Sequence, residues 1–297
     1  MLGRAAPSAR RRARYAAKAL KEECGVFGIA GHGKAAGLAA LGLHALQHRG
    51  QEAVGVATFD GERFHTERSL GLVSELFSDA AAIERLKGPF AIGHTRYSTQ
   101  GETVLRNVQP LYADLARGGI AIAHNGNLTN AVTLRAELVS EGCIFQSTSD
   151  SELFLQLAAR SSQPSFVDRV IDSLRQVEGA YALTVLTPEG LIGARDPVGI
   201  RPLVLGKLDG KAVLASETCA LSLIGADFVR DIAPGEAVIC RDDGTVESRE
   251  AVPAPSHPRP CIFELIYFSR PDSFIDGKSV YGLRKSLGAR LAQEAPG

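Results

Sequence analysis

Cys24 stands at the head of an apolar stretch and is a candidate for thiol chemistry. Residues 24–30 read CGVFGIA, a mixture of small and bulky apolar residues that is typical of a buried strand with a closely approached backbone. A cysteine in such a place is often only a small buried hydrophobe. A nucleophile is the other interpretation, because Gly25 leaves room for a substrate beside the thiol.

The residues before Cys24 bear on this chemistry, because their removal would leave Cys24 with a free α-amine. Residues 1–23 hold seven basic and two acidic side chains and are rich in Ala and Arg. We expect them to be a cleaved propeptide or leader, with an organellar transit peptide as the alternative. A free α-amine has a pKa of about 8 and can act as general base for the thiol of the same residue.

Polar residues that could complete such a site follow two predicted strands. Arg96 comes after the strand predicted over 90–93, and Asn125 with Gly126 comes after the strand predicted over 120–123. A guanidinium binds a carboxylate through two parallel hydrogen bonds, and the Asn amide and Gly N–H can donate to an oxyanion. An Asn-Gly pair is also typical of a tight turn, which is the alternative interpretation.

Asp150 supplies the negative charge that the ammonium of an amino-acid substrate requires. Ser149 and Glu152 have the spacing of a capping box, which predicts that Asp150 lies in the first turn of a helix over 153–159. Helix capping is therefore the alternative role for Asp150. If these loop positions converge, a thiolate, a cation, an anion and two donors together suit attack on the amide of an amino acid.

The remaining pattern predicts short strands and helices in layers rather than regular βαβ units. The proline-rich residues 253–260 predict a stiff linker, and residues 242–245 predict a hairpin turn. The predicted helices cover 38–46, 132–139, 153–159, 166–177 and 279–292, and the predicted strands cover 24–30, 53–59, a stretch from 63, 90–93, 120–123, 181–187, 191–194, 203–207, 213–216, 237–240 and 261–268.

The composition limits the class of protein. The chain of 297 residues has zero net charge, 45% hydrophobic residues and a mean hydropathy of +0.01, which favours a globular protein that binds neither nucleic acid nor a membrane surface. No apolar run reaches the roughly 18 residues of a membrane span. Five scattered cysteines without a CxxC pair favour reduced thiols in the cytoplasm, and the basic leader keeps an organelle as the alternative.

Five separated motifs together resemble the class II glutamine amidotransferase domain, which has an N-terminal cysteine nucleophile (Ntn type). The resemblance runs from Glu23 to about Leu291. It implies an α+β fold, a four-layer αββα sandwich of the Ntn hydrolase type, followed by the truncated start of a phosphoribosyltransferase domain. The motifs, in chain order, are residues 24–28, 47–51, 93–97, 124–128 and 149–152.

The resemblance implies a role for each candidate residue. Cys24 would be the catalytic nucleophile, and Asn125 and Gly126 would form the oxyanion hole. Arg96 and Asp150 would bind the α-carboxylate and the α-ammonium of glutamine. The family hydrolyses the side-chain amide of glutamine through a γ-glutamyl thioester and passes the ammonia to a second domain.

Three further stretches resemble the family members whose second domain is a phosphoribosyltransferase: residues 196–203, 216–218 and 267–273. In those members the ammonia is used to form phosphoribosylamine in the first step of purine synthesis. The expected partners are glutamine, a phosphoribosyltransferase domain or subunit, and further copies of the full-length chain in a homo-oligomer. The expected domains are a leader over 1–23, a glutamine amidotransferase type 2 domain over 24–252, and a linker with the truncated start of a phosphoribosyltransferase domain over 253–297.

Two other positions have roles implied by the resemblance. Arg49 would lie beside the nucleophile and support it. Cys261 matches the first cysteine ligand of a [4Fe–4S] cluster that some members carry, but a single ligand cannot hold a cluster. We therefore expect no metal or cofactor within this stretch, and Mg²⁺ and, in some members, a [4Fe–4S] cluster in the full-length enzyme.

Two alternatives to this function remain at the level of sequence. The same domain could supply ammonia for glucosamine-phosphate, glutamate or asparagine synthesis, although residues 196–203 and 267–273 argue against it. The chain could also be a non-catalytic fragment that binds glutamine or a partner subunit. No motif residue is degraded, which favours the enzyme.

Overall fold

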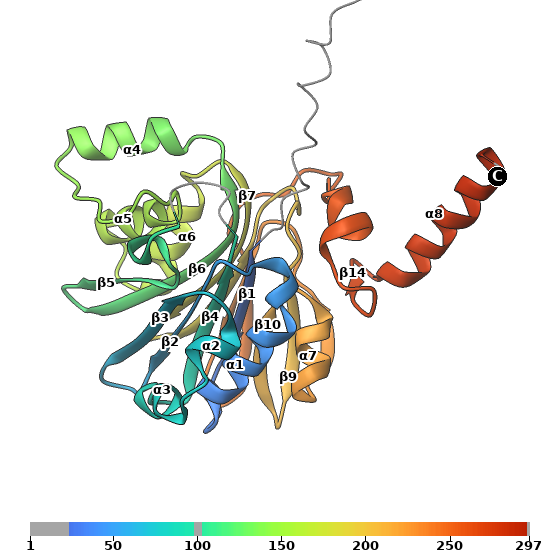
Figure 1. Cartoon of the computed structure of the whole chain (residues 1–297). Helices are drawn as coiled ribbons and strands as arrows, with labels where there is room; N and C mark the ends of the chain where they lie inside the picture. Colours follow the sequence, from blue (N-terminus) through green and yellow to red (C-terminus); the bar gives the residue numbers. More distant parts are fainter. Residues whose placement is uncertain (1–23, 98–102, 296–297) are drawn as a thin grey trace, which may run out of the picture.

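Two antiparallel sheets face each other in the part of the chain that the computed structural model describes, residues 24–97 and 103–295 (Figure 1). The predicted leader, residues 1–23, lies outside the described residues. The strands are β1 Gly25–Ile29, β2 Ala53–Phe59, β3 Phe64–Leu70, β4 Phe90–Arg96, β5 Leu111–Leu115, β6 Gly118–Leu128, β7 Gly179–Thr187, β8 Gly190–Arg195, β9 Val204–Leu208, β10 Lys211–Ala215, β11 Asp227–Asp231, β12 Glu236–Cys240, β13 Val246–Glu250, β14 Phe274–Ile275 and β15 Lys278–Ser279.

Helices cover the outer face of each sheet. The helices are α1 Ala35–Ala45, η2 Gln47–Arg49, α2 Val73–Leu76, α3 Ala80–Arg85, η3 Leu105–Asn107, α4 Ala131–Ser140, α5 Glu152–Arg160, α6 Phe166–Leu174, α7 Thr218–Ile224, η4 Glu264–Phe268 and α8 Val280–Glu294. Helices α1 and α7 pack on one sheet, and α5 and α6 pack on the other (Figure 1).

The strand order explains how the layers form. The first sheet has the order β11-β9-β10-β1-β4-β2-β3, and the second has the order β13-β12-β8-β7-β6-β5. One apolar core lies between the sheets, and a further core lies under each helical layer. Central strands such as β2 are therefore buried on both faces, which their continuous apolar sequence requires. This arrangement confirms the expected four-layer αββα sandwich.

Close packing of α1 on the first sheet depends on small residues. A Cβ added to Gly42 of α1 would collide with the Phe27 ring of β1, and a Cβ added to Gly93 of β4 would lie 2.6 Å from Leu43. The glycines thus let the helix and the sheet approach closely beside the strand that follows Cys24.

Several predicted boundaries differ from the structure, most of them by one to three residues. The ladders of β4 and β6 continue beyond their apolar runs to Arg96 and Leu128, because neighbouring strands pair with them along the whole length. Residues 261–268, predicted as a strand, form a helical turn instead, with η4 as its main part. The hairpin turn predicted at 242–245 is confirmed between β12 and β13.

Residues 261–295, called the C-terminal segment here, lie beside the sandwich and end in α8, which extends away from it (Figure 1). Asp276 of this segment accepts hydrogen bonds of 2.9 and 3.2 Å from the buried Arg195 of β8. The backbone N–H of Cys261 also donates to Ile200 at 3.2 Å. The segment is therefore joined to the sandwich through specific polar contacts.

Candidate active site

Cys24 lies immediately before β1 and is buried. Its Sγ lies 3.4 Å from the carbonyl oxygen of Tyr97, just beyond β4, and Gly25 pairs with Thr95 of β4. A Cβ on Gly25 would lie 2.8 Å from the Thr95 hydroxyl and 3.0 Å from Leu46, so a larger residue would push the strand away. The glycine therefore keeps Cys24 against β4.

Two other cysteines are unsuited to nucleophilic chemistry. Cys219 and Cys240 lie in the cores, and burial raises the pKa of each thiol to about 12. Both remain protonated near neutral pH, and a thiol is a much weaker nucleophile than a thiolate. Cys143 and Cys261 are partly exposed and lie on other parts of the chain.

Asn125 is fully buried in β6, yet no described residue forms a hydrogen bond with its side-chain amide. Neither its Nδ2 nor its Oδ1 has a hydrogen-bond partner among the described residues. Buried amides are almost always hydrogen-bonded, so such a group is poised for a ligand. The tight-turn alternative is wrong, because Asn125 pairs with Ala182 of β7 in a continuous ladder.

Gly126 follows in the same strand and cannot be replaced by an L-residue without strain. Its φ is +149°, and a Cβ would collide with the carbonyl oxygen of Ala180. The backbone at this point therefore takes a course that only glycine allows, directly after the unsatisfied amide of Asn125.

Two buried histidines bring the ends of β4 and β6 together. His94 Nε2 lies 3.0 Å from the carbonyl oxygen of His124, two residues before Arg96 and one residue before Asn125. Burial, with the charge of Arg96, lowers the pKa of His94 to about 3, and burial also lowers the pKa of His124. Both rings are neutral near pH 7 and act as polar spacers between the sheets.

Arg96 and Asp150 lie on either side of this contact. Arg96 is the last residue of β4, is buried, and its Nη1 donates to the carbonyl of Asn107 at 3.3 Å. One carboxylate oxygen of Asp150 accepts from the backbone N–H of Leu128 at 2.9 Å, and the other lies 3.9 Å from His124 Nδ1. Asp150 is thus fastened to the end of β6.

The capping-box prediction is wrong. Helix α5 begins at Glu152, so Asp150 precedes it, and the helix has no side-chain cap. The Glu152 carboxylate accepts from the backbone N–H groups of Gln146 and Ser147 instead, because the loop before the helix folds back over it. Asp150 therefore does not cap α5, and its side chain faces β6.

Arg49 lies next to Cys24, as the resemblance implied, but its partners were not predicted. Its Nε donates to the carbonyl oxygen of Cys24 at 3.0 Å, and its Nη atoms contact the carboxylates of Glu217 and Glu264. Glu217 is in the stretch 216–218, to which the sequence gives no role, and Glu264 is in the stretch 261–268, which was predicted as a strand. A glutamate within the apolar run CIFELIYF was the signal that could have found it.

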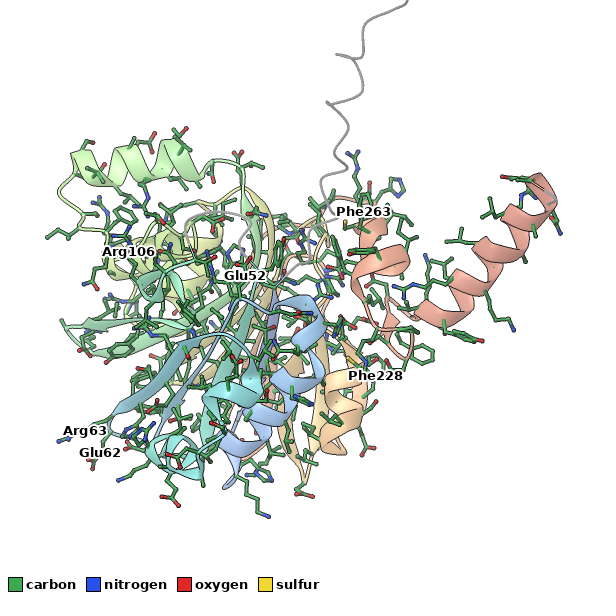
Figure 2. The ribbon with its side chains drawn as sticks, viewed as in Figure 1. Glu52, Glu62, Arg63, Arg106, Phe228 and Phe263 are labelled. Carbon is green, nitrogen blue, oxygen red and sulfur yellow. The ribbon has the colours of Figure 1, made fainter. Side chains whose placement is uncertain are left out.

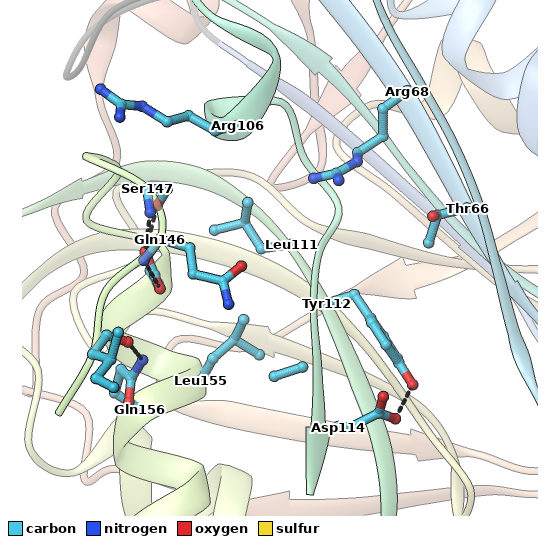
Figure 3. A pocket seen from close by; sticks show the side chains of 13 residues that line it. Thr66, Arg68, Arg106, Leu111, Tyr112, Asp114, Gln146, Ser147, Leu155 and Gln156 are labelled. Atoms are coloured by element: carbon cyan, nitrogen blue, oxygen red, sulfur yellow. Dashed lines mark hydrogen bonds between the residues drawn. The ribbon is translucent and has the colours of Figure 1, made fainter.

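A cavity of about 640 Å³ lies elsewhere, between β3, β5 and the loop before α5 (Figure 3). Arg68 and Arg106 face it, and Tyr112 is hydrogen-bonded to Asp114 at its wall. Its lining includes none of the candidate residues described above. The loop before α5 lines this cavity with Ile144, Gln146 and Ser147, and further along it presents Asp150 to β6.

The described residues contain no group of three or more His, Cys, Asp or Glu side chains placed to hold a metal ion. Within the described ranges, no helix is both long and apolar enough to cross a membrane.

Residues 94–222 match the family described as "Glutamine amidotransferase domain". Across 280 residues the chain is 56% identical to an amidophosphoribosyltransferase of Rhizobium etli, covering 93% of this chain and 56% of the relative. It is 47% identical over 283 residues to the enzyme of that name from Synechococcus elongatus, covering 93% and 57%.

Solved structures agree with these relatives. The glutamine phosphoribosylpyrophosphate amidotransferase of B. subtilis, solved with ADP and GMP, is 43% identical with a TM-score of 0.85, covering 92% of this chain and 58% of that one. A structure titled as the allosteric regulatory enzyme of purine biosynthesis gives a TM-score of 0.87 at the same identity and coverage.

The fold and the family match define a glutamine amidotransferase domain of the Ntn type. Beyond that class, the chain is similar to amidophosphoribosyltransferases along 93% of its length, and it spans about half the length of the curated relatives it matches.

Proposed function

We propose that this chain hydrolyses the side-chain amide of glutamine, with Cys24 as the nucleophile. The observation that carries this proposal is the buried amide of Asn125, which has no partner among the described residues and lies at the same end of the sandwich as Cys24 and Arg96. A donor held in place without a protein acceptor suits an oxyanion that exists only during the reaction.

The steps follow from the groups present. The thiol of Cys24 gives its proton to its own α-amine once residue 24 is the N-terminus, and the sulfur attacks the amide carbon of glutamine. Asn125 Nδ2 and the N–H of Gly126 donate to the oxyanion of the tetrahedral intermediate. The C–N bond then breaks, the amine returns the proton to the departing ammonia, and water cleaves the thioester to release glutamate.

Arg96 and Asp150 would bind the other end of glutamine. The Arg96 guanidinium would pair with the α-carboxylate. One Asp150 oxygen accepts from Leu128, and the other would accept hydrogen bonds from the α-ammonium. Both side chains are buried, which strengthens each ion pair with a bound substrate.

We further propose that the ammonia passes to a phosphoribosyltransferase domain, forming phosphoribosylamine from phosphoribosyl pyrophosphate. The names of the relatives support this recipient over the glucosamine-phosphate, glutamate and asparagine alternatives. The C-terminal segment offers an apolar surface for a partner domain or a second copy, and its Phe263 lies at the top of that segment in Figure 2, 42% exposed. Mg²⁺ and a [4Fe–4S] cluster remain proposals for the longer protein, as do cytoplasmic location and homo-oligomer formation.

The test begins with the N-terminus. Intact-mass analysis identifies chains that begin at Cys24 and chains that retain residues 1–23, and glutamate release from glutamine measures their activity. We expect activity only in the first group, and Cys24→Ala should reduce turnover below detection, at least about 10³-fold.

Cys143→Ala is the matched control, because this partly exposed cysteine lies outside the site and should leave turnover unchanged. Activity in Cys24→Ala would remove the nucleophile from the proposal. Full activity with residues 1–23 attached would exclude the α-amine as the base.

A further inference from the structure

Arg49 joins the nucleophile to two carboxylates that come from distant parts of the chain. Its side chain is 0% exposed, and Glu217 and Glu264 lie 168 and 215 residues further along the sequence. Burial disfavours the cation, but the two carboxylates outweigh that effect and raise the pKa of Arg49. The guanidinium is therefore a fixed, fully charged group directly behind Cys24.

The geometry of the guanidinium assigns different tasks to the two carboxylates. Glu264 accepts from both Nη atoms, at 2.9 and 2.8 Å, whereas Glu217 accepts from Nη1 alone at 2.6 Å. A two-point contact fixes the plane of a guanidinium, and a one-point contact does not. Once Glu264 has fixed that plane, Arg49 Nε points at the Cys24 carbonyl, 3.0 Å away.

Glu264 is itself held by other groups. Ser269 Oγ donates to one of its oxygens at 3.1 Å, and Arg201 Nη1 donates to the other at 3.3 Å. Arg284 in α8 fixes the same turn by donating to the carbonyls of Leu265 and Ser269. The position of the Glu264 carboxylate therefore follows the position of the C-terminal segment.

The carbonyl of Cys24 is the backbone group through which Arg49 holds this residue. Once residue 24 is the N-terminus, no peptide bond precedes it, so the covalent backbone holds this residue from its carbonyl side alone. Rotation about the Cα–C bond of Cys24 would move both the thiol and the α-amine relative to Asn125. A displacement of about 1 Å at reacting groups can cost about a hundredfold in rate.

We propose that Glu264 is a positioning residue for Cys24 that acts through Arg49, so that the C-terminal segment sets the orientation of the nucleophile. This inference rests on the proposed function for its kinetic consequence. It assigns to the C-terminal segment a direct part in the glutaminase site, in addition to any part in binding another domain.

The test compares two matched carboxylate-to-amide changes in the C-terminal segment. Glu264→Gln removes the charge and one acceptor from the contact with Arg49. Asp276→Asn makes the same change at Arg195, which anchors the same segment and has no contact with Cys24. Glutamine turnover is measured for both in protein whose N-terminus is confirmed as Cys24.

We expect Glu264→Gln to lower kcat roughly tenfold while KM changes less than about twofold, because the substrate contacts remain and the nucleophile is misaligned. Asp276→Asn should change kcat less than about twofold. Glu264→Asp keeps the charge but withdraws the carboxylate, so an intermediate loss of kcat is expected, and it replaces Glu264→Gln if that variant does not fold. Equal losses of kcat in Glu264→Gln and Asp276→Asn, or no loss in the Glu264 variants, would overturn the inference.

A second measurement separates this inference from the proposed function. The rate at which iodoacetamide alkylates Cys24, followed by mass spectrometry, requires no glutamine. It should change severalfold in Glu264→Gln and stay constant in Asp276→Asn. If the wild-type protein releases no glutamate, the proposed function fails, and unequal alkylation rates still support the positioning role while equal rates refute it.

Discussion

The side chains of Arg49 and Asn125 are both buried, but they differ in the number of hydrogen-bond partners that the protein gives them. Arg49 contacts the Cys24 carbonyl and two carboxylates, and Glu217 also accepts from His48, Ser273 and the backbone of Arg270. The Asn125 amide has no partner among the described residues. A satisfied network holds its members in place, whereas an unsatisfied buried donor is useful only to a ligand.

This difference indicates that the two regions contribute to catalysis in different ways. Changing the Arg49 region should alter how the nucleophile is held, and changing the Asn125 region should alter what the site does to a bound substrate. The cavity in Figure 3 is larger than either region and offers no such unsatisfied group among its lining residues. Cavity size alone would therefore have pointed to the wrong place.

The largest expected effect is the loss of kcat in variants of Asn125. Asn125→Gly and Asn125→Asp both remove the amide donor, so kcat should fall about 10²–10³-fold, equivalent to roughly 3–4 kcal/mol. KM for glutamine should change little, because the oxyanion forms only in the transition state. Steady-state kinetics measure both constants, and thermal unfolding checks the fold.

Near-normal kcat in Asn125→Gly would leave the N–H of Gly126 as the only proposed donor. Thr58→Val is a matched control for the loss of a buried polar group, since the Thr58 hydroxyl is also without a partner among the described residues. It lies near the other end of β2 from the site and should not affect kcat.

Asp150 combines a structural contact with a free position for a ligand. One carboxylate oxygen accepts from the backbone N–H of Leu128, and the other faces the candidate site. Asp150→Asn can still accept from Leu128 N–H but loses the charge for an ammonium. A hydrogen bond to a charged group contributes about 1.5–3 kcal/mol, so kcat/KM for glutamine should fall about 10–100-fold. A simple amide without an α-amine should be affected far less; equal losses on both substrates would reduce Asp150 to a support for β6.

The smallest effect concerns acidification, which should affect the two regions at different pH. The folded pKa of His94 is about 3 and that of His124 is also lowered, so the unfolded chain binds more protons below about pH 6.5. The contribution of His94 is then fully present above pH 6.5 and falls as the pH drops, by about 1 kcal/mol between pH 6.5 and 5.5, and the contribution of His124 falls in the same direction.

The Arg49 region should weaken only in stronger acid. Burial disfavours the Glu217 anion, but the His48 hydrogen bond and the Arg49 charge outweigh it and lower the pKa of Glu217 to about 2. Its contribution is present above the unfolded pKa of about 4.3 and is lost as the pH falls towards 2. Chemical denaturation at a series of pH values measures the free energy of unfolding across both ranges. His94→Gln should reduce the loss of stability below pH 6.5 and leave the loss in stronger acid unchanged.

Much of this protein could be predicted from the order of its residues. The apolar runs predicted most central strands, and the stripes of residues 132–139 and 153–159 predicted helices that the structure contains as α4 and α5. Cys24, Arg96, Asn125 and Asp150 could be named because each stands in a short motif whose residue types suit one kind of chemistry. Local pattern suffices where neighbouring residues determine the conformation.

Only the tertiary structure decided which groups are satisfied and by what. Arg49 meets Glu264 across 215 residues of chain, and no local pattern records such a contact. Glu264 is buried in this contact, and the residues around it form a helical turn. Their apolar sequence by itself favours a strand. The side-chain amide of Asn125 has no partner among the described residues, because the ladder of β6 and β7 continues past Asn125 and holds its backbone. Burial, pairing and charge at these positions depend on distant residues, and for that reason they follow from the folded chain alone.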